Sequence, residues 1–275
     1  MLRVADVSFA YGLAGRRSRG STSRRSDEDR LVLDAISLQV ERGVIVGLLG
    51  PNGSGKTTLI KLMAGLLYPQ RGQVLLDGRP IDLLARRQLA QRVALVPQDT
   101  HSTLDYSVLD IVLMGRYPHL GPLALEGPLD LALAREALVA TGLSAFERRP
   151  FGTLSGGEKQ RVVIAAALAQ ASDILLLDEP TASLDLAYQL EIGALLRQLN
   201  RERGTTMVLS THDLNLAAGL CDRIVLLKEG RVLADGPTAE TLTTERVHDA
   251  YGVSADVQFN ERAGHVTVVP LARHH

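Results

Sequence analysis

The sequence has only one cysteine and almost no net charge. Cys221 cannot form a disulfide within the chain, and a lone thiol fits a reducing compartment such as the cytosol. The formal net charge is −1 at pH 7, because 30 basic residues are balanced by 31 acidic ones. Such a chain has no overall field that attracts polyanions, so we expect no nucleic-acid partner.

Long hydrophobic runs are missing as well. The first residues, MLRVADVSFAYG, alternate as a strand does and lack the apolar block of a secretory signal peptide. No uncharged apolar run reaches the ~18 residues that cross a bilayer. The longest candidate, 162–172, stops at Asp173. We therefore expect a protein that does not itself cross a membrane but can sit on a partner that does.

Short apolar runs alternate with longer helical patterns, which predicts an α/β fold with a largely parallel sheet. We expect strands at 44–49, 73–76, 93–96, 174–178, 206–210 and 224–227. We expect helices at 56–66, 186–203 and 214–219. The stretch from about 100 to 170 shows no clear strand pattern and predicts an inserted helical subdomain.

Two segments are expected to be peripheral. Residues 12–30 are rich in Arg, Ser and Asp and have almost no apolar side chains, which predicts a flexible loop. Residues 247–275 contain two alternating runs, ADVQFN and HVTVVPL, which predict a β-hairpin. We thus expect one domain over 1–246 and a short C-terminal tail over 247–275, whose last two residues are His274 and His275.

The strongest motif is a phosphate loop. Residues 50–57 fit G-x-x-x-x-G-K-[ST], between an apolar strand pattern and a helix pattern. In such a loop the backbone amides point at phosphate oxygens, the lysine reaches the β and γ phosphates, and the hydroxyl after it binds Mg²⁺. The predicted nucleotide-binding residues are Gly50, Pro51, Asn52, Gly53, Ser54, Gly55, Lys56, Thr57 and Thr58.

An acidic pair follows the buried strand pattern at 174–178. Asp178 emerges at the carboxyl end of that strand, where α/β sheets bind their ligands. Its oxygens suit Mg²⁺, which prefers octahedral oxygen ligands. Glu179 is placed to polarise the water that attacks the γ-phosphate. The two carboxylates therefore predict metal binding and catalysis beside the phosphate loop.

A helix pattern begins with two glycines, although glycine is a poor helix former. Ser155 and Glu158 have the spacing of a capping box. That spacing does not explain Gly156 and Gly157, and we interpret them as leaving amides bare for a bulky anion. The phosphate loop already has its own helix, so a second anion site within one copy would be redundant. We therefore interpret this site as one that closes over the nucleotide of another copy.

The ordered set of motifs resembles that of the ATP-binding-cassette (ABC) ATPases, over about residues 1–240. It runs from GPNGSGKTT through LVPQD, LSGGEKQR and ILLLDEP to SLD at 183–185 and STHD. The resemblance implies a P-loop NTPase core with a largely parallel sheet, an antiparallel β portion and an inserted helical subdomain. It also implies ATP and Mg²⁺ as ligands, ATP hydrolysis, and a head-to-tail dimer that traps two ATP molecules.

The resemblance assigns roles to four further residues. Tyr11 resembles the aromatic residue that stacks on adenine, and Gln98 the residue that contacts Mg²⁺ and senses the helical subdomain. Asp185 resembles the residue that crosses the dimer interface. His212 resembles the switch histidine that contacts the γ-phosphate, and with Gln98 and Glu179 it completes the predicted catalytic set.

A segment of the helical region narrows the resemblance. The sequence SVLDIVLMGRYPH, which ends at Tyr117, Pro118 and His119, resembles the ATPases of importers for iron-siderophore, haem and cobalamin. In that group a homodimer docks on two permease subunits, and an external binding protein delivers the ligand. The resemblance thus implies a peripheral subunit on the cytoplasmic face of the inner membrane.

Two other classes of protein remain open. A soluble ABC ATPase could serve iron–sulfur assembly, DNA repair or translation, although repair types carry zinc-binding cysteines and translation types carry two cassettes. A P-loop kinase could phosphorylate a small molecule, but it would need neither residues 155–158 nor a dimer.

Overall fold

The computed structural model describes residues 1–12, 31–98, 106–121, 124–182 and 184–273. The predicted flexible loop at 12–30 lies outside these residues except for Gly12, and Ser183, His274 and His275 also lie outside them. The chain divides into two compact units. The first is Met1–Glu41, Val46–Leu83 and His212–His275, and the second is Arg42–Ile45 and Leu84–Thr211.

The first unit contains a four-stranded antiparallel sheet in the order β2-β1-β4-β5. Its strands are β1 (Leu2–Phe9), β2 (Leu33–Val40), β4 (Arg71–Leu76) and β5 (Arg79–Pro80). Leu2 lies opposite Val40 on one side and Leu76 on the other, and all three are buried. Because successive side chains of a strand point to opposite faces, this register places one apolar face on the core.

The same unit contains a second group of strands, of which β3 (Ile45–Leu49) begins at the boundary between the units. Strand β3 pairs in parallel with β9 (Arg223–Lys228), and β9 pairs antiparallel with β10 (Arg231–Pro237). All five residues of β3 are buried, as expected for a strand covered on both faces. The phosphate-loop sequence leaves β3 and enters α1 (Lys56–Met63). The unit also contains η2 (Ile81–Leu83) and α7 (Leu214–Leu220).

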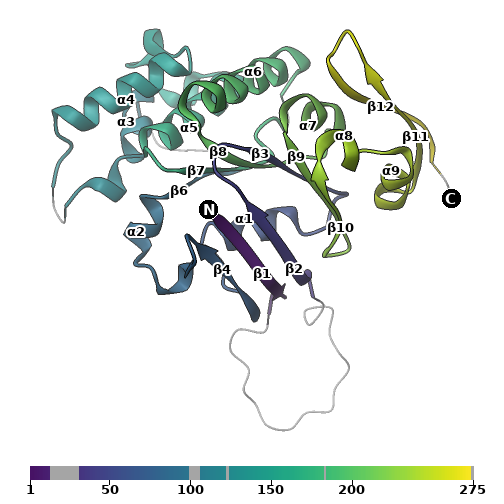
Figure 1. Ribbon diagram of the computed structural model, residues 1–275. Coiled ribbons are helices and arrows are strands. Elements are labelled where there is room, and N and C mark those ends of the chain that lie inside the picture. Colours follow the sequence, from purple (N-terminus) through teal and green to yellow (C-terminus); the bar gives the residue numbers. More distant parts are fainter. Residues whose placement is uncertain (13–30, 99–105, 122–123, 183, 274–275) are drawn as a thin grey trace. The chain divides into compact units, whose positions relative to one another are not determined.

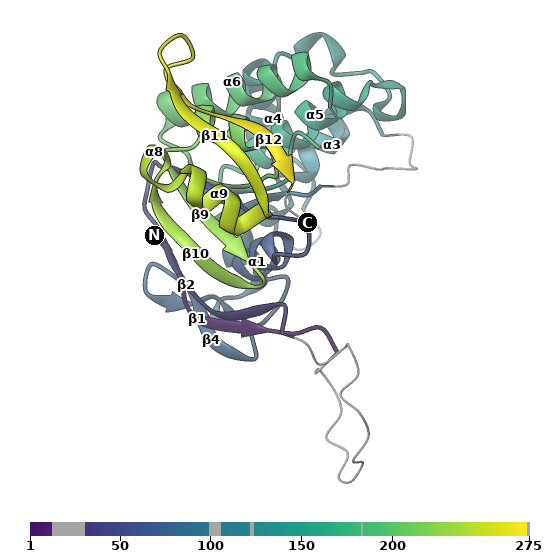
Figure 2. The same ribbon diagram turned by 90° about the vertical axis from the view of Figure 1, so that its right-hand side faces the viewer.

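The C-terminal residues of the first unit form two helices and a hairpin. They are α8 (Thr238–Thr241), α9 (Thr244–Tyr251), β11 (Val253–Asn260) and β12 (His265–Arg273). Helix α9 lies against β11, where Val247, Ala255 and Val268 form a small buried cluster (Figure 2). The Asn260 side chain accepts hydrogen bonds from two amides of the hairpin turn, at 3.0 and 3.1 Å. This turn fixes the register of β11 and β12.

The second unit contains three parallel strands in the order β8-β7-β6. They are β6 (Val93–Val96), β7 (Ile174–Asp178) and β8 (Thr206–Ser210), and every residue of β7 and β8 is buried. The connection from β7 to β8 is α6 (Leu186–Arg203), which runs from its N-cap Asp185 to Gly204 with φ 63°. The carboxyl ends of the three strands therefore meet at one edge.

The remaining elements of the second unit are helical. Helices α3 (Val108–Met114), α4 (Pro128–Ala140) and α5 (Gly156–Ala169) pack on a common apolar core that includes Val112, Leu138 and Val162 (Figure 1). Shorter helical turns are α2 (Arg86–Ala90), η3 (Tyr117–His119), η4 (Ser144–Phe146) and η5 (Phe151–Thr153). The mixed helices and strands of the two units confirm the predicted α/β class. None of the helices in the described ranges has the length and hydrophobicity required to cross a bilayer.

Candidate nucleotide site

The phosphate loop in the first unit depends on glycine. Gly50 and Gly55 have φ values of 150° and 100°, which other residues rarely adopt. A Cβ on Gly50 would collide with the Leu227 carbonyl oxygen, and one on Gly55 would collide with the Leu33 side chain. The loop is thus pressed against β9 and β2, which fixes its backbone before any ligand arrives.

Lys56 folds back over the loop. Its side chain is only 6% exposed, and Nζ donates to the carbonyl oxygens of Gly50 at 2.8 Å and Pro51 at 3.2 Å. The Ser54 hydroxyl is also buried and has no hydrogen-bond partner within the described residues. A buried hydroxyl without a partner is costly in a folded protein. The loop therefore offers a buried cation and an unused hydroxyl, the groups that phosphate oxygens require.

The structure brings Tyr11 to this loop. Its hydroxyl lies 3.1 Å from Oγ1 of Thr58 on α1, and its ring meets that of Phe9 edge to face at 4.9 Å. The Tyr11 side chain is 47% exposed, so part of the ring is open for stacking. The side chain is held at the start of α1, and its stacking on adenine stays a prediction.

In the second unit, Asp178 lies at the carboxyl edge of the parallel strands. It is 4% exposed, and its Oδ1 accepts a hydrogen bond of 2.6 Å from the Ser210 hydroxyl. Ser210 ends β8 directly opposite Asp178. The sequence motifs did not single out Ser210, although it is the first residue of the STHD motif and ends a predicted strand.

Glu179 has a strained backbone. Its φ is 48°, in the left-handed region, and its amide donates to the carbonyl oxygen of Ser210 at 3.1 Å and to its hydroxyl at 2.9 Å. Non-glycine residues in this region are uncommon and cluster at functional sites, because surrounding contacts must hold them there. Ser210 thus orients the Asp178 carboxylate and holds the backbone of Glu179.

Gln98 belongs to the same edge. It follows β6 by two residues, and β6 pairs with β7 in a register that places Val96 opposite Leu177. Its side chain is exposed. The carboxyl ends of β6, β7 and β8 therefore bring together Gln98, the acidic pair and Ser210.

The predicted capping box at the start of α5 is confirmed. The Ser155 amide donates to Glu158 Oε2 at 2.7 Å, and the Glu158 amide donates to the Ser155 hydroxyl at 3.3 Å. The Ser155 hydrogen bond holds the pKa of Glu158 below its ordinary value, and Arg149 and Arg161 contribute less. The α5 N-terminus is therefore capped by its own side chains.

The two glycines of α5 have different surroundings. A Cβ on Gly157 would lie 2.6 Å from Cγ and 2.9 Å from Cε1 of Tyr188, so the Tyr188 ring fills its place. A Cβ on Gly156 would meet only the Leu184 side chain, at 3.8 Å. Packing against Tyr188 thus gives Gly157 a structural reason that the sequence did not reveal, and the interpretation of both glycines as an opening for an anion stays a prediction.

The last two predicted residues lie at helix starts. Asp185 is the N-cap of α6, where its carboxylate accepts from the Tyr188 amide at 3.0 Å. His212 is exposed and belongs to the first unit, one residue before the α7 N-cap Asp213. Asp185 therefore has a capping function, and the assigned roles of Asp185 and His212 toward nucleotide stay predictions.

Sequence comparison matches residues 33–182, more than half of the chain, to the family described as ABC transporter. The chain belongs to the ABC transporter family.

Three relatives in this family are named as import ATP-binding proteins. The cobalamin import ATP-binding protein of Halobacterium salinarum is 39% identical over 87% of this chain, which spans only 60% of that relative's length. The iron(3+)-hydroxamate import ATP-binding protein of Bacillus subtilis is 37% identical over 85% of this chain and 87% of its own. The hemin import ATP-binding protein of Gloeobacter violaceus is 41% identical over 88% of this chain and 90% of its own. The predicted resemblance to ATPases of these importers is confirmed.

Two solved structures of the family share this fold. One is described as an inward-facing conformation of a metal-chelate type ABC transporter. It has a TM-score of 0.82, 30% identity, and coverage of 98% of this chain and 97% of that chain. The other is a dimeric ATP-binding cassette in a post-hydrolysis state with ADP and Pi bound. Its TM-score is 0.72 at 30% identity, over 86% of this chain and 99% of that chain. The predicted ABC ATPase fold is confirmed.

Proposed function

We propose that this chain is the ATP-hydrolysing subunit of an ABC importer that drives uptake of a metal chelate through a partner permease. The observation that carries the proposal is the likeness, over 98% of the chain, to the metal-chelate type transporter. The import relatives support it and leave iron-siderophore, haem and cobalamin as candidate chelates. We assign ATP hydrolysis to residues 1–246 and regard 247–275 as a tail with a β-hairpin.

We assign ATP to the phosphate loop. The buried Lys56 ammonium would exchange its carbonyl partners for the β and γ phosphates. The unpaired Ser54 hydroxyl and the first amides of α1 would donate to phosphate oxygens. Tyr11 would stack on the adenine.

Mg²⁺ fits the oxygen groups that the chain offers. Thr57, Gln98 and Asp178 would hold it, in keeping with the preference of this ion for hydroxyl, amide and carboxylate oxygens. When bound, the ion neutralises charge that develops on the phosphates. Ser210 keeps the Asp178 carboxylate oriented through the hydrogen bond of 2.6 Å.

Glu179 is the proposed general base. Its carboxylate would accept a proton from the water that attacks the γ-phosphorus, while the bond to the β,γ-bridging oxygen breaks and leaves ADP. His212 would donate a hydrogen bond to the γ-phosphate. The left-handed backbone at Glu179 supports this role, because strained conformations of this kind cluster at functional sites.

The proposed active form is a homodimer. Residues Ser155, Gly156, Gly157 and Glu158 of one copy would close over the ATP bound by the phosphate loop of the other, and Asp185 would lie at that interface. The dimeric cassette with ADP and Pi supports this arrangement. Hydrolysis would remove the phosphate that joins the copies, and ATP can drive closure only as far as it binds the closed form more tightly.

The proposed location is the cytoplasmic face of the inner membrane, as a peripheral subunit. The partners are integral-membrane permease subunits and, indirectly, an external substrate-binding protein. The word import in the names of the relatives supports this assignment.

The first test is co-purification from detergent-solubilised native membranes, with this chain as bait and mass spectrometry as the readout. We expect a many-helix permease in equal stoichiometry, and an equal amount with Lys56→Ala bait, because docking does not need hydrolysis. Soluble partners alone would overturn the importer proposal in favour of a cytosolic ABC ATPase.

A second test addresses the dimer. Glu179→Gln should bind ATP without hydrolysing it and elute as a dimer with ATP and as a monomer with ADP. Light scattering after size-exclusion chromatography measures both states. A Glu179→Gln variant that stays monomeric with ATP would contradict the head-to-tail dimer.

A further inference from the structure

Helix α7 lies against one strand of the C-terminal hairpin. Strand β12 runs beside this helix in the same unit (Figure 1). Near the end of α7, a Cβ built on Gly219 would lie 3.0 Å from Nε2 of His265, the first residue of β12. At the start of α7, Leu214 packs against the buried cluster that contains Val268. The hairpin therefore supports α7 at both ends.

Asn215 links the start of the helix to this strand through two hydrogen bonds. Its Oδ1 accepts from the Val268 amide at 2.8 Å, and its Nδ2 donates to the Val268 carbonyl oxygen at 3.1 Å. Val268 lies opposite Val257 of β11 in an antiparallel ladder. Alternate residues of such a ladder direct both backbone groups away from the paired strand. The carboxamide of Asn215 therefore bonds Val268 as a third strand would.

The pair of bonds fixes how the Asn215 side chain is turned. An exchange of its oxygen and nitrogen atoms would place an acceptor on the carbonyl and a donor on the amide, and both bonds would be lost. The side chain of Val268 is only 3% exposed. An apolar side chain at position 215 would leave the backbone groups of Val268 without these partners, which is costly away from water.

The first turn of α7 connects Asn215 to His212. The N-cap of the helix is Asp213, whose carboxylate accepts from the amides of Asn215 and Leu216, both at 2.9 Å. His212 directly precedes this cap, and its side chain is exposed. Because Asp213 bonds the amide of Asn215, a displacement of Asn215 moves the cap and the residue before it.

We propose that Asn215 is a positioning residue for ATP hydrolysis, which holds the start of α7 on the C-terminal hairpin and thereby places His212 for its hydrogen bond to the γ-phosphate. The inference rests on the proposed function, which gives His212 that role. Catalytic groups must be held within about 0.5 Å of their productive geometry. An exposed side chain such as His212 depends for this on the backbone that carries it. The hairpin is then a support of the nucleotide site and not an appendage.

The experiment measures the steady-state ATPase kinetics of the purified chain. Asn215→Leu keeps the approximate size of the side chain and removes both hydrogen bonds. It should lower kcat by about 10- to 100-fold, since a misplacement of about 1 Å can cost the larger factor. The KM for ATP should stay within about twofold, because the phosphate loop is unchanged. Asn215→Asp keeps the acceptor and loses the donor, so its kcat should lie between those of wild type and Asn215→Leu.

A double variant tests whether Asn215 acts through His212. In a His212→Ala background, Asn215→Leu should cause no further fall in kcat, since no histidine is left to misplace. The same fall in both backgrounds would overturn the inference. So would an unchanged kcat in Asn215→Leu while His212→Ala is impaired. A His212→Ala variant with the kcat of wild type would instead overturn the role of His212 in the proposed function.

A second asparagine separates placement from stability. Asn200 also bonds two backbone groups, since its Nδ2 donates to the carbonyl oxygens of Gly43 at 2.8 Å and Thr205 at 2.9 Å, all within the second unit. Asn200→Leu should lower the urea concentration at which the chain unfolds, as Asn215→Leu does, but it should keep kcat. An equal fall in kcat in both variants would show that Asn215 acts through stability alone and would overturn the inference.

Discussion

The helix starts that the sequence marks for phosphate, those of α1 and α5, are built in opposite ways. Helix α1 follows Gly55, which has a φ of 100° and no side chain that could accept from the first amides. Helix α5 follows Ser155, whose hydroxyl and amide exchange hydrogen bonds with Glu158. One N-terminus has no side-chain cap, and the other is capped by its own side chains.

The difference shows how each helix is stabilised. Helix α1 depends on packing, since six of its eight residues are buried and no side chain caps its first turn. Helix α5 obtains a cap from its own sequence and needs no ligand to begin where it does. A single copy thus has a candidate phosphate site without a side-chain cap at α1, whereas α5 begins with its own capping box.

The largest expected effect comes from the N-terminus without a side-chain cap, that of α1. Lys56→Ala removes the only side-chain cation of the motif, and loss of one such group from a preorganised site typically costs about 10²–10³-fold in rate. We expect ATPase activity to fall by that factor and nucleotide affinity to weaken, as measured by phosphate release and by titration calorimetry. Lys61→Ala, a substitution on the same helix but outside the motif, is the matched control and should keep both.

Alanine substitutions at the two adjacent glycines of α5 should change the unfolding free energy in opposite directions. Gly157→Ala drives a methyl group into the Tyr188 ring, and overpacking of this kind costs about 1–3 kcal/mol of unfolding free energy. Gly156→Ala meets no obstacle and should gain up to about 1 kcal/mol from helix propensity, yet lose ATPase activity. Urea unfolding and phosphate release measure the two effects.

A double variant tests the cause at Gly157. Gly157→Ala combined with Tyr188→Ala should be less destabilised than the sum of the single variants, because the ring is gone. Additive losses would show that contact with Tyr188 is not the reason for glycine at this position.

Removal of the Ser155 cap of α5 should have a smaller effect. Ser155→Ala removes the hydroxyl cap and should cost about 1 kcal/mol of unfolding free energy. The chain contains a matched control, because Ser107 caps α3 with the same pair of bonds to Asp110. Ser107→Ala should cost a similar amount of stability, but only Ser155→Ala should lower ATPase activity. Equal loss of activity in both variants would mean that Ser155 acts through stability alone.

Local patterns predicted much of the fold. The strands at 93–96, 174–178 and 206–210 and the helix at 186–203 have the predicted bounds, since each is an apolar run or an amphipathic pattern between polar or glycine boundaries. Helix α1 ends at Met63 rather than at residue 66, because Gly65 adopts a φ of 68°. The phosphate loop and the acidic pair were predictable for the same reason, as each is one continuous motif.

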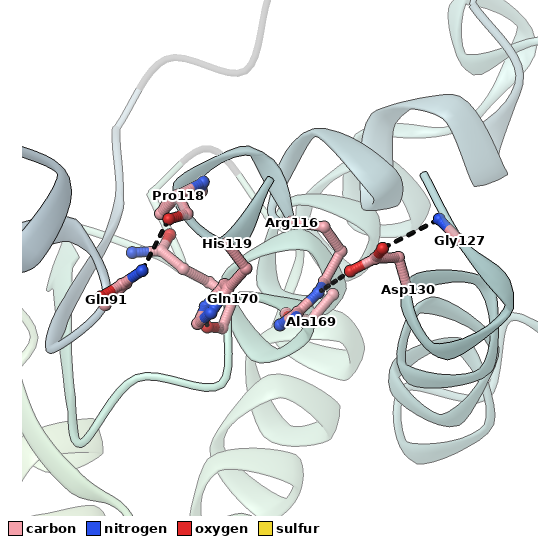
Figure 3. Close-up of polar contacts among 8 residues, drawn as sticks. All are labelled: Gln91, Arg116, Pro118, His119, Gly127, Asp130, Ala169 and Gln170. Atoms are coloured by element: carbon pink, nitrogen blue, oxygen red, sulfur yellow. Dashed lines mark hydrogen bonds and ion pairs between the residues drawn. The ribbon is translucent and has the colours of Figure 1, made fainter. Parts of the chain in front are cut away.

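Contacts between distant residues were not predictable from local patterns. Ser210 reaches Asp178 only through the register of β7 and β8, and Tyr188 reaches Gly157 from another helix. Arg116 donates to the carbonyl oxygen of Ala169, 53 residues away (Figure 3). Sequence patterns thus located the groups that would touch nucleotide, but not the residues that position them.

The smallest expected effect is on stability in acid, and it also separates the two helix starts. The Ser155 amide holds the pKa of Glu158 below its ordinary value, whereas α1 has no acidic cap. Stability from a lowered pKa is complete above the unfolded value of about 4.3 and is lost as the pH falls through the folded value. Glu158→Gln removes this titration, so its unfolding free energy should decline less steeply below about pH 4.3. Urea unfolding at a series of pH values measures the slope.

Asp130→Asn should flatten the dependence of unfolding free energy on pH in the same direction, because the Gly127 amide, and then Arg116, lower the pKa of Asp130. Identical slopes for wild type and Glu158→Gln would show that the cap contributes no pH-dependent stability.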